Sequence, residues 1–514
     1  MPRFAPLSRL VLLAAALAGC APSSIELAPS APDRPWTPRV NADGEIQPGP
    51  PAPASAAANY VLPSNPAAGR LTDQPEVDTR HVYDLAELID LAERTNPATR
   101  IAWNAARETA LATGVAKSAY LPRIVAAVTG IYQASKGTDT VTVGPLSTSG
   151  VSASGSADGV ISAVTLQWML FDFGQRDAVV AAAEQATVIT NIGFTAVHQQ
   201  VIFDVSSAFY AYAAARAKHG ANEQSLRNAR EVLDAAEERM KKGIGTAIEV
   251  AEARQGVAQA QLLVVQADGA EKSDYVNLVA SVGLTPTTQI GIVDTGRRNL
   301  SAAMAKTIDR NVEKALARRP DVLQAFAAEK ASQAKLRAAQ AEMMPKVFLS
   351  GTGNYNAGDL TTSTIFPTGL QTPIANLSGG RYGGAVLVGA AVPLFDGGVR
   401  EAMIEQARTG VDTAATQLAR TRQQAVRQIV VASTTLTTSL AAYDAAKALA
   451  SASEVTYAAA LASYRGGVGD ITAVSLAQTR LLQARNAQAE AYSAALSAAA
   501  LLALATGSLG SAAP

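Results

Sequence analysis

Leu170-Phe171-Asp172-Phe173-Gly174 returns 224 residues later as Leu394-Phe395-Asp396-Gly397-Gly398, and this repetition decides the fold. Three further pairs keep the same spacing within one residue: Asn96-Pro97 with Arg319-Pro320, Leu121-Pro122 with Met344-Pro345, and Gly243-Ile244-Gly245 with Gly467-Val468-Gly469. A constant offset between several landmarks indicates an internal duplication. We therefore expect two copies of one unit, at residues 82–305 and 306–510.

Each copy is predicted to contain a helix, two strands, a long helix and a further helix. The long helices are expected at 175–241 and 399–465, because both stretches lack proline. Each covers 67 residues, or about 100 Å of helix, far more than a compact domain uses. The other elements are expected as helices at 85–120, 247–282, 308–344 and 471–505, and as strands at 123–132, 160–168, 346–355 and 381–392.

The composition excludes several classes of protein. The 43 basic residues balance the 43 acidic ones, which argues against a nucleic-acid binder. A single cysteine can make neither a disulfide framework nor a cysteine-rich zinc site. The chain is 48% hydrophobic but only 5% aromatic, and alanine makes up the difference. Alanine favours helices that pack closely side by side, as in the wall of a wide tube.

The N-terminus is predicted to be an export signal. Residues 1–19 carry Arg3 and Arg9, then an apolar run too short to span a bilayer. The sequence Leu17-Ala18-Gly19-Cys20 that follows resembles a bacterial lipobox, in which Cys20 becomes the lipidated first residue. An ordinary signal peptide that contains a cysteine is the alternative. Residues 20–80 are rich in proline and predict an extended tether.

The predicted strands require several copies of the chain. Two strands per repeat give four per chain, and four strands cannot close a barrel. Several chains must therefore pool their strands into one lipid-facing barrel and their helices into one tube. The residues alone predict an obligate homo-oligomer with a short β-barrel, a long α-helical extension and an N-terminal lipid anchor.

Two motifs carry a resemblance to a known family. The first spans Trp168 to Gly174 and recurs from Val392 to Gly398; the second is Tyr464-Arg-Gly-Gly-Val-Gly-Asp-Ile-Thr-Ala-Val-Ser-Leu-Ala-Gln478. Together with the duplication, they resemble the TolC-like outer membrane factors, in their lipoprotein branch, over residues 80 to 508. The resemblance implies a mainly α fold, in which a trimer builds a 12-stranded outer membrane β-barrel that continues as a long periplasmic α-helical barrel.

The resemblance also assigns roles to residues. The strand-to-helix junctions would contain Phe171, Asp172 and Gly174 in the first copy and Pro393, Phe395, Asp396 and Gly398 in the second. The helical hairpin tips that dock onto a periplasmic adaptor would contain Gly243, Gly245, Thr246, Gly467, Gly469 and Asp470. Asp470 has two compatible interpretations, capping of the helix that starts at Ile471 and contact with the adaptor.

One departure from the family concerns the residues that close the channel. Members often carry acidic rings after the second tip, where this chain has Ala473 and Leu476. Glu249 and Glu252 occupy the equivalent places in the first copy and share a helix face. They are candidates for a pore constriction, and a solvated helix surface is the alternative.

No pattern indicates catalysis, a cofactor or a metal site, because nucleotide-binding, zinc-protease and hydrolase motifs are absent from the sequence. We therefore expect a passive channel that exports small molecules such as drugs and toxic compounds. It would receive them from an inner-membrane pump, of the RND or ABC type, through the adaptor. The alternatives are the channel of a type I protein secretion system and a non-conducting structural lipoprotein of the periplasm.

Overall fold

The computed structural model describes residues 27–29, 31–33, 36–49, 60–70, 77–139, 151–294, 300, 312–359 and 381–510. The predicted signal sequence, residues 1–19, and Cys20 lie outside these residues. The chain divides into two compact units, Met1–Val77 and Asp78–Pro514. In the first unit, β1 (Arg39–Val40) and β2 (Ile46–Gln47) form a short antiparallel hairpin. Its turn is held by Asn41, whose side-chain oxygen accepts hydrogen bonds from the backbone amides of Asp43 and Glu45.

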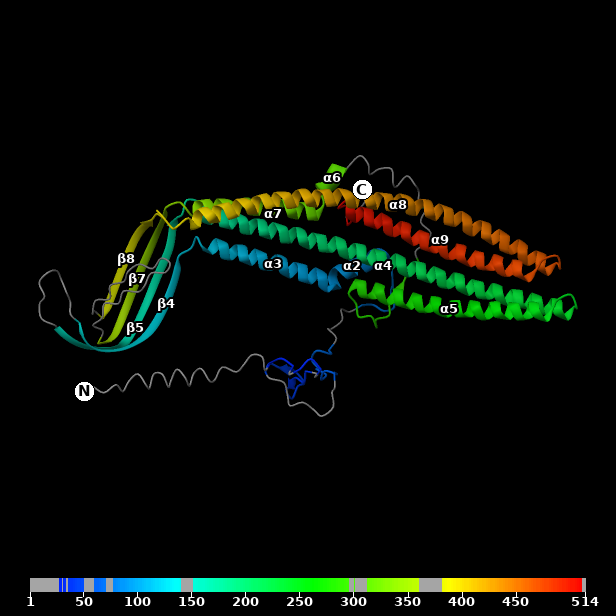
Figure 1. Cartoon of the computed structure of the whole chain (residues 1–514), viewed down its shortest axis with the longest axis horizontal. Coiled ribbons are helices and arrows are strands. Elements are labelled where there is room, and N and C mark those ends of the chain that lie inside the picture. Colours follow the sequence, from blue (N-terminus) through cyan, green and yellow to red (C-terminus); the bar gives the residue numbers. More distant parts are fainter. Residues whose placement is uncertain are drawn as a thin grey trace. The chain divides into compact units, whose positions relative to one another are not determined.

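The second unit contains the two repeats (Figure 1). The first repeat consists of β3 (Val82–Tyr83), α2 (Leu85–Thr95), α3 (Pro97–Ser118), β4 (Arg123–Asp139), β5 (Val151–Phe171), α4 (Gln175–Lys241), α5 (Ala247–Val282) and β6 (Gly291–Ile292). The second consists of α6 (Val312–Leu316), α7 (Pro320–Ala341), β7 (Lys346–Asp359), β8 (Tyr382–Ala391), α8 (Val399–Arg465) and α9 (Ile471–Ala505). The predicted bounds of α4, α5, α8 and α9 are confirmed.

Each predicted first helix is divided in two, so this part of the prediction was wrong. Pro97 and Pro320 open new helices at their first position instead of lying inside one. Asn96 explains the first break, because its backbone is extended and its side chain accepts a hydrogen bond from the amide of Ala98. The break allows α2 to pack on α4 and α5 while α3 follows α4 toward the sheet.

The four long strands form one antiparallel sheet in the order β4-β5-β7-β8. The strands β4, β5 and β7 extend beyond their predicted ends, because the glycine- and serine-rich residues continue the ladder. The β4–β5 pairing runs out to Asp139 opposite Val151. Within the part of the chain that the structure describes, the outer strands β4 and β8 each have one unpaired edge.

The helices lie side by side in antiparallel pairs, α4 with α5 and α8 with α9. Near the sheet, α3 packs on α4 through threonine pairs, with hydroxyl oxygens 2.8 Å apart between Thr113 and Thr187. Far from the sheet, all four helices share an apolar core that contains Val232, Val250, Leu461 and Val474. Among the described residues, no helix is both long and apolar enough to cross a membrane.

Candidate functional site

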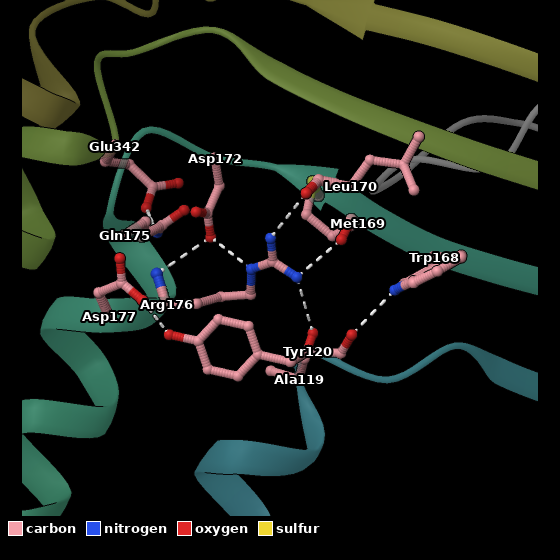
Figure 2. A network of polar contacts seen from close by, with 10 residues as sticks. All are labelled: Ala119, Tyr120, Trp168, Met169, Leu170, Asp172, Gln175, Arg176, Asp177 and Glu342. Carbon is pink, nitrogen blue, oxygen red and sulfur yellow. Dashed lines mark hydrogen bonds and ion pairs between the residues drawn. The ribbon is translucent and has the colours of Figure 1, made fainter.

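The first strand-to-helix junction is organised around the guanidinium group of Arg176 (Figure 2). Its Nε donates to Asp172 Oδ2 at 2.9 Å, and Asp172 is buried. Its two terminal nitrogens donate to the carbonyl oxygens of Met169 at 2.7 Å, Leu170 at 3.2 Å and Ala119 at 3.2 Å. One cation therefore joins the end of β5, the start of α4 and the end of α3.

Further contacts attach this junction to its neighbours. The Trp168 indole donates to the Tyr120 carbonyl at 2.8 Å, and the Tyr120 hydroxyl bonds the Asp177 carboxylate. Gln175 bonds Glu342 at the end of α7, and Glu342 in turn pairs with Lys346 at 2.9 Å. The contact between Gln175 and Glu342 fastens the first repeat to the second.

The second junction has the same backbone but fewer contacts. The residues that open α4 and α8, Gly174 and Gly398, have φ of 90° and 88°, in the left-handed region that favours glycine. Arg400 pairs with Asp396 at 3.0 Å, as Arg176 does with Asp172, yet no carbonyl contact of Arg400 is present among the described residues. Phe395 is exposed and Pro393 is half-buried in the short connection after β8. The predicted junction residues therefore lie together in each copy.

The two hairpin tips have one backbone geometry. Gly243 and Gly467 follow the long helices with φ of 76° and 83°, a conformation that costs other residues free energy. Gly245 and Gly469 lie against the preceding helix turn, so that a Cβ at either would come within 2.8 Å of a backbone nitrogen. Glycine is therefore required at these four positions.

One arginine links the two tips to each other. Arg239 on α4 donates to the Tyr464 carbonyl at 2.9 Å, and its guanidinium carbon lies 4.7 Å from the centre of the Tyr464 ring. Tyr464, at the end of α8, is fully buried, and its hydroxyl donates to Glu249 Oε2 at 3.4 Å. A second contact, 2.6 Å between Arg465 and Glu231, lies beside it.

The structure gives Glu249 and Glu252 different surroundings. Glu249 Oε2 lies 3.9 Å from Arg239 Nε and reaches back to the amide of Thr246, whose hydroxyl accepts from the Glu249 amide. This reciprocal pair is a capping box at the start of α5. Glu252, one turn later, is exposed. Asp470 occupies the equivalent first position of α9, but its side chain makes no capping hydrogen bond.

Burial changes the acidity of two tyrosines near the tips. Removal from water raises the pKa of Tyr457 to about 12, and the nearby Glu231 carboxylate adds to the shift. Burial likewise raises the pKa of Tyr464, with a further contribution from Glu249. Both phenols therefore stay neutral at physiological pH, and Tyr464 remains a hydrogen-bond donor to Glu249.

The described residues contain no group of three or more metal-binding side chains. Each histidine instead contacts a glutamate: His81 Nε2 lies 2.9 Å from Glu87, His198 Nδ1 lies 3.6 Å from Glu93, and His219 Nδ1 lies 2.6 Å from Glu271. These contacts join neighbouring elements.

Comparison with known proteins shows to which family this arrangement belongs. Residues 88–284 and 311–508 match the outer membrane efflux protein family. The chain belongs to this family. Each repeat matches separately, so the duplication inferred from the sequence coincides with two copies of the family's unit.

Individual relatives and the solved structures of other proteins agree with this family assignment. The chain is 29% identical to protein CyaE of Bordetella pertussis over 438 residues, which cover 85% of each chain. It is 25% identical to outer membrane protein OprJ of Pseudomonas aeruginosa over 296 residues, 58% of this chain and 59% of OprJ. The crystal structure of outer membrane protein VceC from Vibrio cholerae shares the fold with a TM-score of 0.67 at 21% identity, covering 82% of this chain and 96% of VceC.

These findings confirm the expected family, fold class and general function. The protein is an outer membrane channel of the tripartite efflux or secretion type, with an extension into the periplasm. Channels of this family are homotrimers that work with adaptor proteins and inner-membrane pumps. The family and the fold are those of channels and not of enzymes.

Two residues that organise these networks were not singled out in the sequence. Arg176 had a signal, because an arginine follows the aspartate by four residues in both copies, at Asp172 and again at Asp396. No sequence signal marked Arg239, because its repeat equivalent is Ser463 and its partner Tyr464 lies 225 residues away.

Proposed function

We propose that this channel exports small toxic molecules, received from an inner-membrane pump through a periplasmic adaptor. The observation that carries the proposal is the pair of matched hairpin tips. They lie at the far ends of α4 and α8, each 67 residues long, about 100 Å from the sheet. Helix pairs of this length, ending in two rigid turns of equal geometry, suit a tube that reaches across the periplasm to a partner.

The adaptor would bind the apex of each tip. Ile244 and Val468 occupy equivalent positions there, and both are exposed, Val468 to 88%. Exposed apolar residues on rigid turns are typical of protein docking sites. Gly243, Gly245, Thr246, Gly467, Gly469 and Asp470 would set the shape of these sites.

Efflux is preferred to protein secretion because both repeats match a family of efflux proteins. Deletion of the gene should lower the minimal inhibitory concentrations of several unrelated compounds, and the intact gene should restore them. Unchanged susceptibility together with loss of one secreted protein would replace efflux by type I secretion. Absence of conductance in planar bilayers would favour a structural lipoprotein instead. Replacement of the gene of the inner-membrane pump, whether of the RND or the ABC type, would identify which pump supplies the energy for export.

The assembly would be a homotrimer whose three sheets close into a 12-stranded β-barrel. Four antiparallel strands with two free edges support this arrangement, because pooling of strands removes the edges. The mass of the purified particle tests it directly. A monomeric particle would contradict it.

The N-terminus would be processed at Cys20 and anchored by lipid in the outer membrane. The lipobox supports this, since Cys20 is the only cysteine of the chain. Metabolic labelling with a palmitate analogue should mark the wild type and not Cys20→Ser. Labelling of both would contradict lipidation at this residue.

Glu252 is proposed as the main member of a charged constriction near the tips. Three copies of an exposed carboxylate on one helix face would meet around a threefold axis if that face lines the lumen. Glu249 would contribute less, because its carboxylate already contacts Arg239 and Tyr464. Glu252→Gln should reduce cation selectivity in single-channel recordings more than Glu249→Gln does; unchanged selectivity in Glu252→Gln would exclude the constriction.

A further inference from the structure

A long groove lies between three helices, away from both ends of the helical part. Its walls belong to α4, α8 and α9, and its volume is about 940 Å³. α9 packs on both α4 and α8 and lies between them (Figure 1). The lining extends along α4 from Tyr210 to Arg227, about 25 Å of helix. Arg216 lies about 60 Å from the start of α4, so the groove is separate from the junctions and the tips.

The lining of this groove has an excess of positive charge. Four of its side chains are cationic and two are carboxylates: Arg216, Arg227, Lys447, Arg485, Asp294 and Glu454. Arg485 donates to Glu454 at 3.0 Å, so these two charges neutralise each other. Arg216 and Lys447 are exposed, and neither side chain has an ion pair or a hydrogen bond among the described residues. Two cations, one from α4 and one from α8, are therefore available to a bound anion.

The duplication shows that the fold does not require these residues. The repeat equivalents of α4 and α5 are α8 and α9, at an offset of 224 residues. At this offset, the cations Arg216, Lys447 and Arg485 correspond to Leu440, Glu223 and Gln261. None of the three tyrosines of the lining is a tyrosine in the other copy, where Thr434, His219 and Asp268 stand. The same helices form without these side chains, so their presence in the groove has another cause.

Aromatic rings and uncharged polar groups complete the lining. The rings of Tyr443 on α8 and Tyr492 on α9 lie 5.3 Å apart, and Tyr210 lies on the α4 wall. Ser451 and Gln488 add a hydroxyl and an amide. Tyrosine combines an apolar ring with a polar hydroxyl. This combination matches a sugar ring, which is apolar on its face and carries hydroxyls at its edge.

Small residues give the groove its depth. Gly220 lines it in the interior of α4, where glycine is less favourable than alanine. A Cβ at Gly220 would meet no atom within 4 Å. Packing within the chain therefore does not require glycine at this position. The missing side chain instead leaves room for a ligand against the helix backbone.

We propose that this groove binds an acidic glycan chain. Arg216 and Lys447 would pair with its carboxylates, while Tyr210 and Tyr492 would contact its sugar rings. A groove about 25 Å long suits a chain of several sugars better than a single small anion. Lipid headgroups are too far away, because the groove lies about 60 Å along α4 from the sheet. The bound glycan would hold the helical part of the channel to a polymer of the periplasm.

A docking helix of a protein fits this lining less well. Helices that bind in grooves present an apolar stripe to apolar side chains. Among the described residues of the lining, Leu496 is the one large aliphatic side chain, and it is buried. The remaining positions are charged, polar, tyrosine, alanine or glycine. The groove therefore offers hydrogen bonds and charge instead of an apolar seat.

Calorimetric titration of the full-length channel in detergent tests the proposal. Tetragalacturonate should bind and neutral maltotetraose should not, and added salt should weaken binding. Arg216→Gln with Lys447→Gln should raise the Kd about a hundredfold, since each lost charge-assisted contact counts about tenfold. The matched control, Arg230→Gln with Arg480→Gln, removes two exposed cations of α4 and α9 that lie outside the groove, and should leave the Kd unchanged.

Two results of this titration would overturn the proposal. One is absence of tetragalacturonate binding to the wild type. The other is an equal loss in both double variants, which would show unspecific attraction to the surface. If the wild type binds no glycan while the first double variant loses adaptor binding, the groove belongs to a protein partner.

The source of the glycan is tested with purified cell-wall sacculi. Co-sedimentation of the wild type, lost in Arg216→Gln with Lys447→Gln and kept in the control, would assign the groove to the cell wall. Binding of tetragalacturonate without co-sedimentation would assign it to a free acidic glycan. Both results support the groove as a glycan site, and they identify its ligand.

A variant that leaves every charge in place tests the shape of the groove. Gly220→Leu should abolish tetragalacturonate binding, because its side chain would occupy the groove, while the thermal midpoint should not fall. Gly256→Leu is the matched control: Gly256 is exposed on α5, and a Cβ there also meets no atom within 4 Å. Unchanged binding in Gly220→Leu would place the ligand elsewhere and contradict the proposal.

Discussion

The two strand-to-helix junctions have nearly the same residues and backbone, yet the first is held by a network and the second is exposed. Arg176 binds a buried aspartate and three carbonyls, whereas Arg400 binds an exposed aspartate. The difference lies in the neighbours: the first junction contacts the second repeat through Gln175 and Glu342, and no equivalent contact of the second junction is present among the described residues. Closely similar motifs can therefore contribute differently to the stability of the fold, according to which residues cover them.

The largest effect is expected from breaking the covered network. Arg176→Ala should reduce the free energy of unfolding by about 3–5 kcal/mol, because it leaves the Asp172 carboxylate buried without a counter-charge. Arg400→Ala should cost less than about 1 kcal/mol, as is usual for exposed pairs. Denaturant titrations of both variants in detergent measure the difference.

The control for this prediction is the double variant Arg176→Ala with Asp172→Ala. Removal of both charges should recover part of the loss, since no buried charge remains. Equal costs for Arg176→Ala and Arg400→Ala would show that coverage does not distinguish the two junctions.

The next effect concerns the tips, where the second repeat has Ser463 in place of Arg239. Arg239→Ala should destabilise the tips by about 2 kcal/mol, through loss of its hydrogen bonds and its stacking on Tyr464. Its repeat equivalent Ser463→Ala should have little effect. Hydrogen exchange of residues 239–250 should become faster in the first variant only, and unchanged protection there would show that Arg239 does not join the tips.

A smaller effect should separate the two helix starts. Thr246→Ala removes a hydroxyl that accepts from the Glu249 amide and should cost about 1 kcal/mol. Asp470→Ala removes no capping hydrogen bond, so the thermal midpoint should stay unchanged. A clear loss in Asp470→Ala, combined with normal adaptor binding, would contradict the observed cap geometry.

The smallest effect at neutral pH is expected from Tyr457→Phe. The Tyr457 hydroxyl is buried and has no partner among the described residues, so its loss should change stability by less than about 1 kcal/mol. The pKa of Tyr457 is raised to about 12. Folding therefore favours the neutral phenol, and its stabilising effect is complete below pH 10 and lost as pH rises toward 12.

The variant tests this directly at high pH. The wild type should lose more stability than Tyr457→Phe between pH 10 and pH 12. The first repeat has Leu233 at the equivalent position, which does not titrate. Parallel curves for the two proteins would show that Tyr457 is accessible to water.

The sequence predicted regular elements better than their contacts. The bounds of α4 and α8 followed from the absence of proline between Gln175 and Lys241 and between Val399 and Arg465. The break at Asn96-Pro97 was missed, although proline at the first helical position is a known start signal. Strand ends were missed because glycine and serine weaken the alternating pattern while the backbone still pairs.

The site was predicted in part, for a physical reason. Gly243, Gly245, Gly467 and Gly469 were recognised because the glycine pairs recur 224 residues apart after the long helices, and the structure shows that the backbone requires glycine there. The cross-link by Arg239 depends on which helices meet in space, and no local pattern encodes that contact. The pairs of Arg176 with Asp172 and of Arg400 with Asp396 had a signal in the sequence, because each joins residues four positions apart and both copies contain it.

The cross-link between the tips also has a consequence for the order of events during synthesis. Arg239 and Tyr464 are separated by 225 residues, so at typical elongation rates the arginine is made about 10 to 45 s before its partner. Contacts so distant in sequence form late and slowly. The first hairpin tip therefore reaches its final conformation only after the second repeat has been synthesised. A chain truncated before Tyr464 would lack the contact that links Arg239 to the second tip.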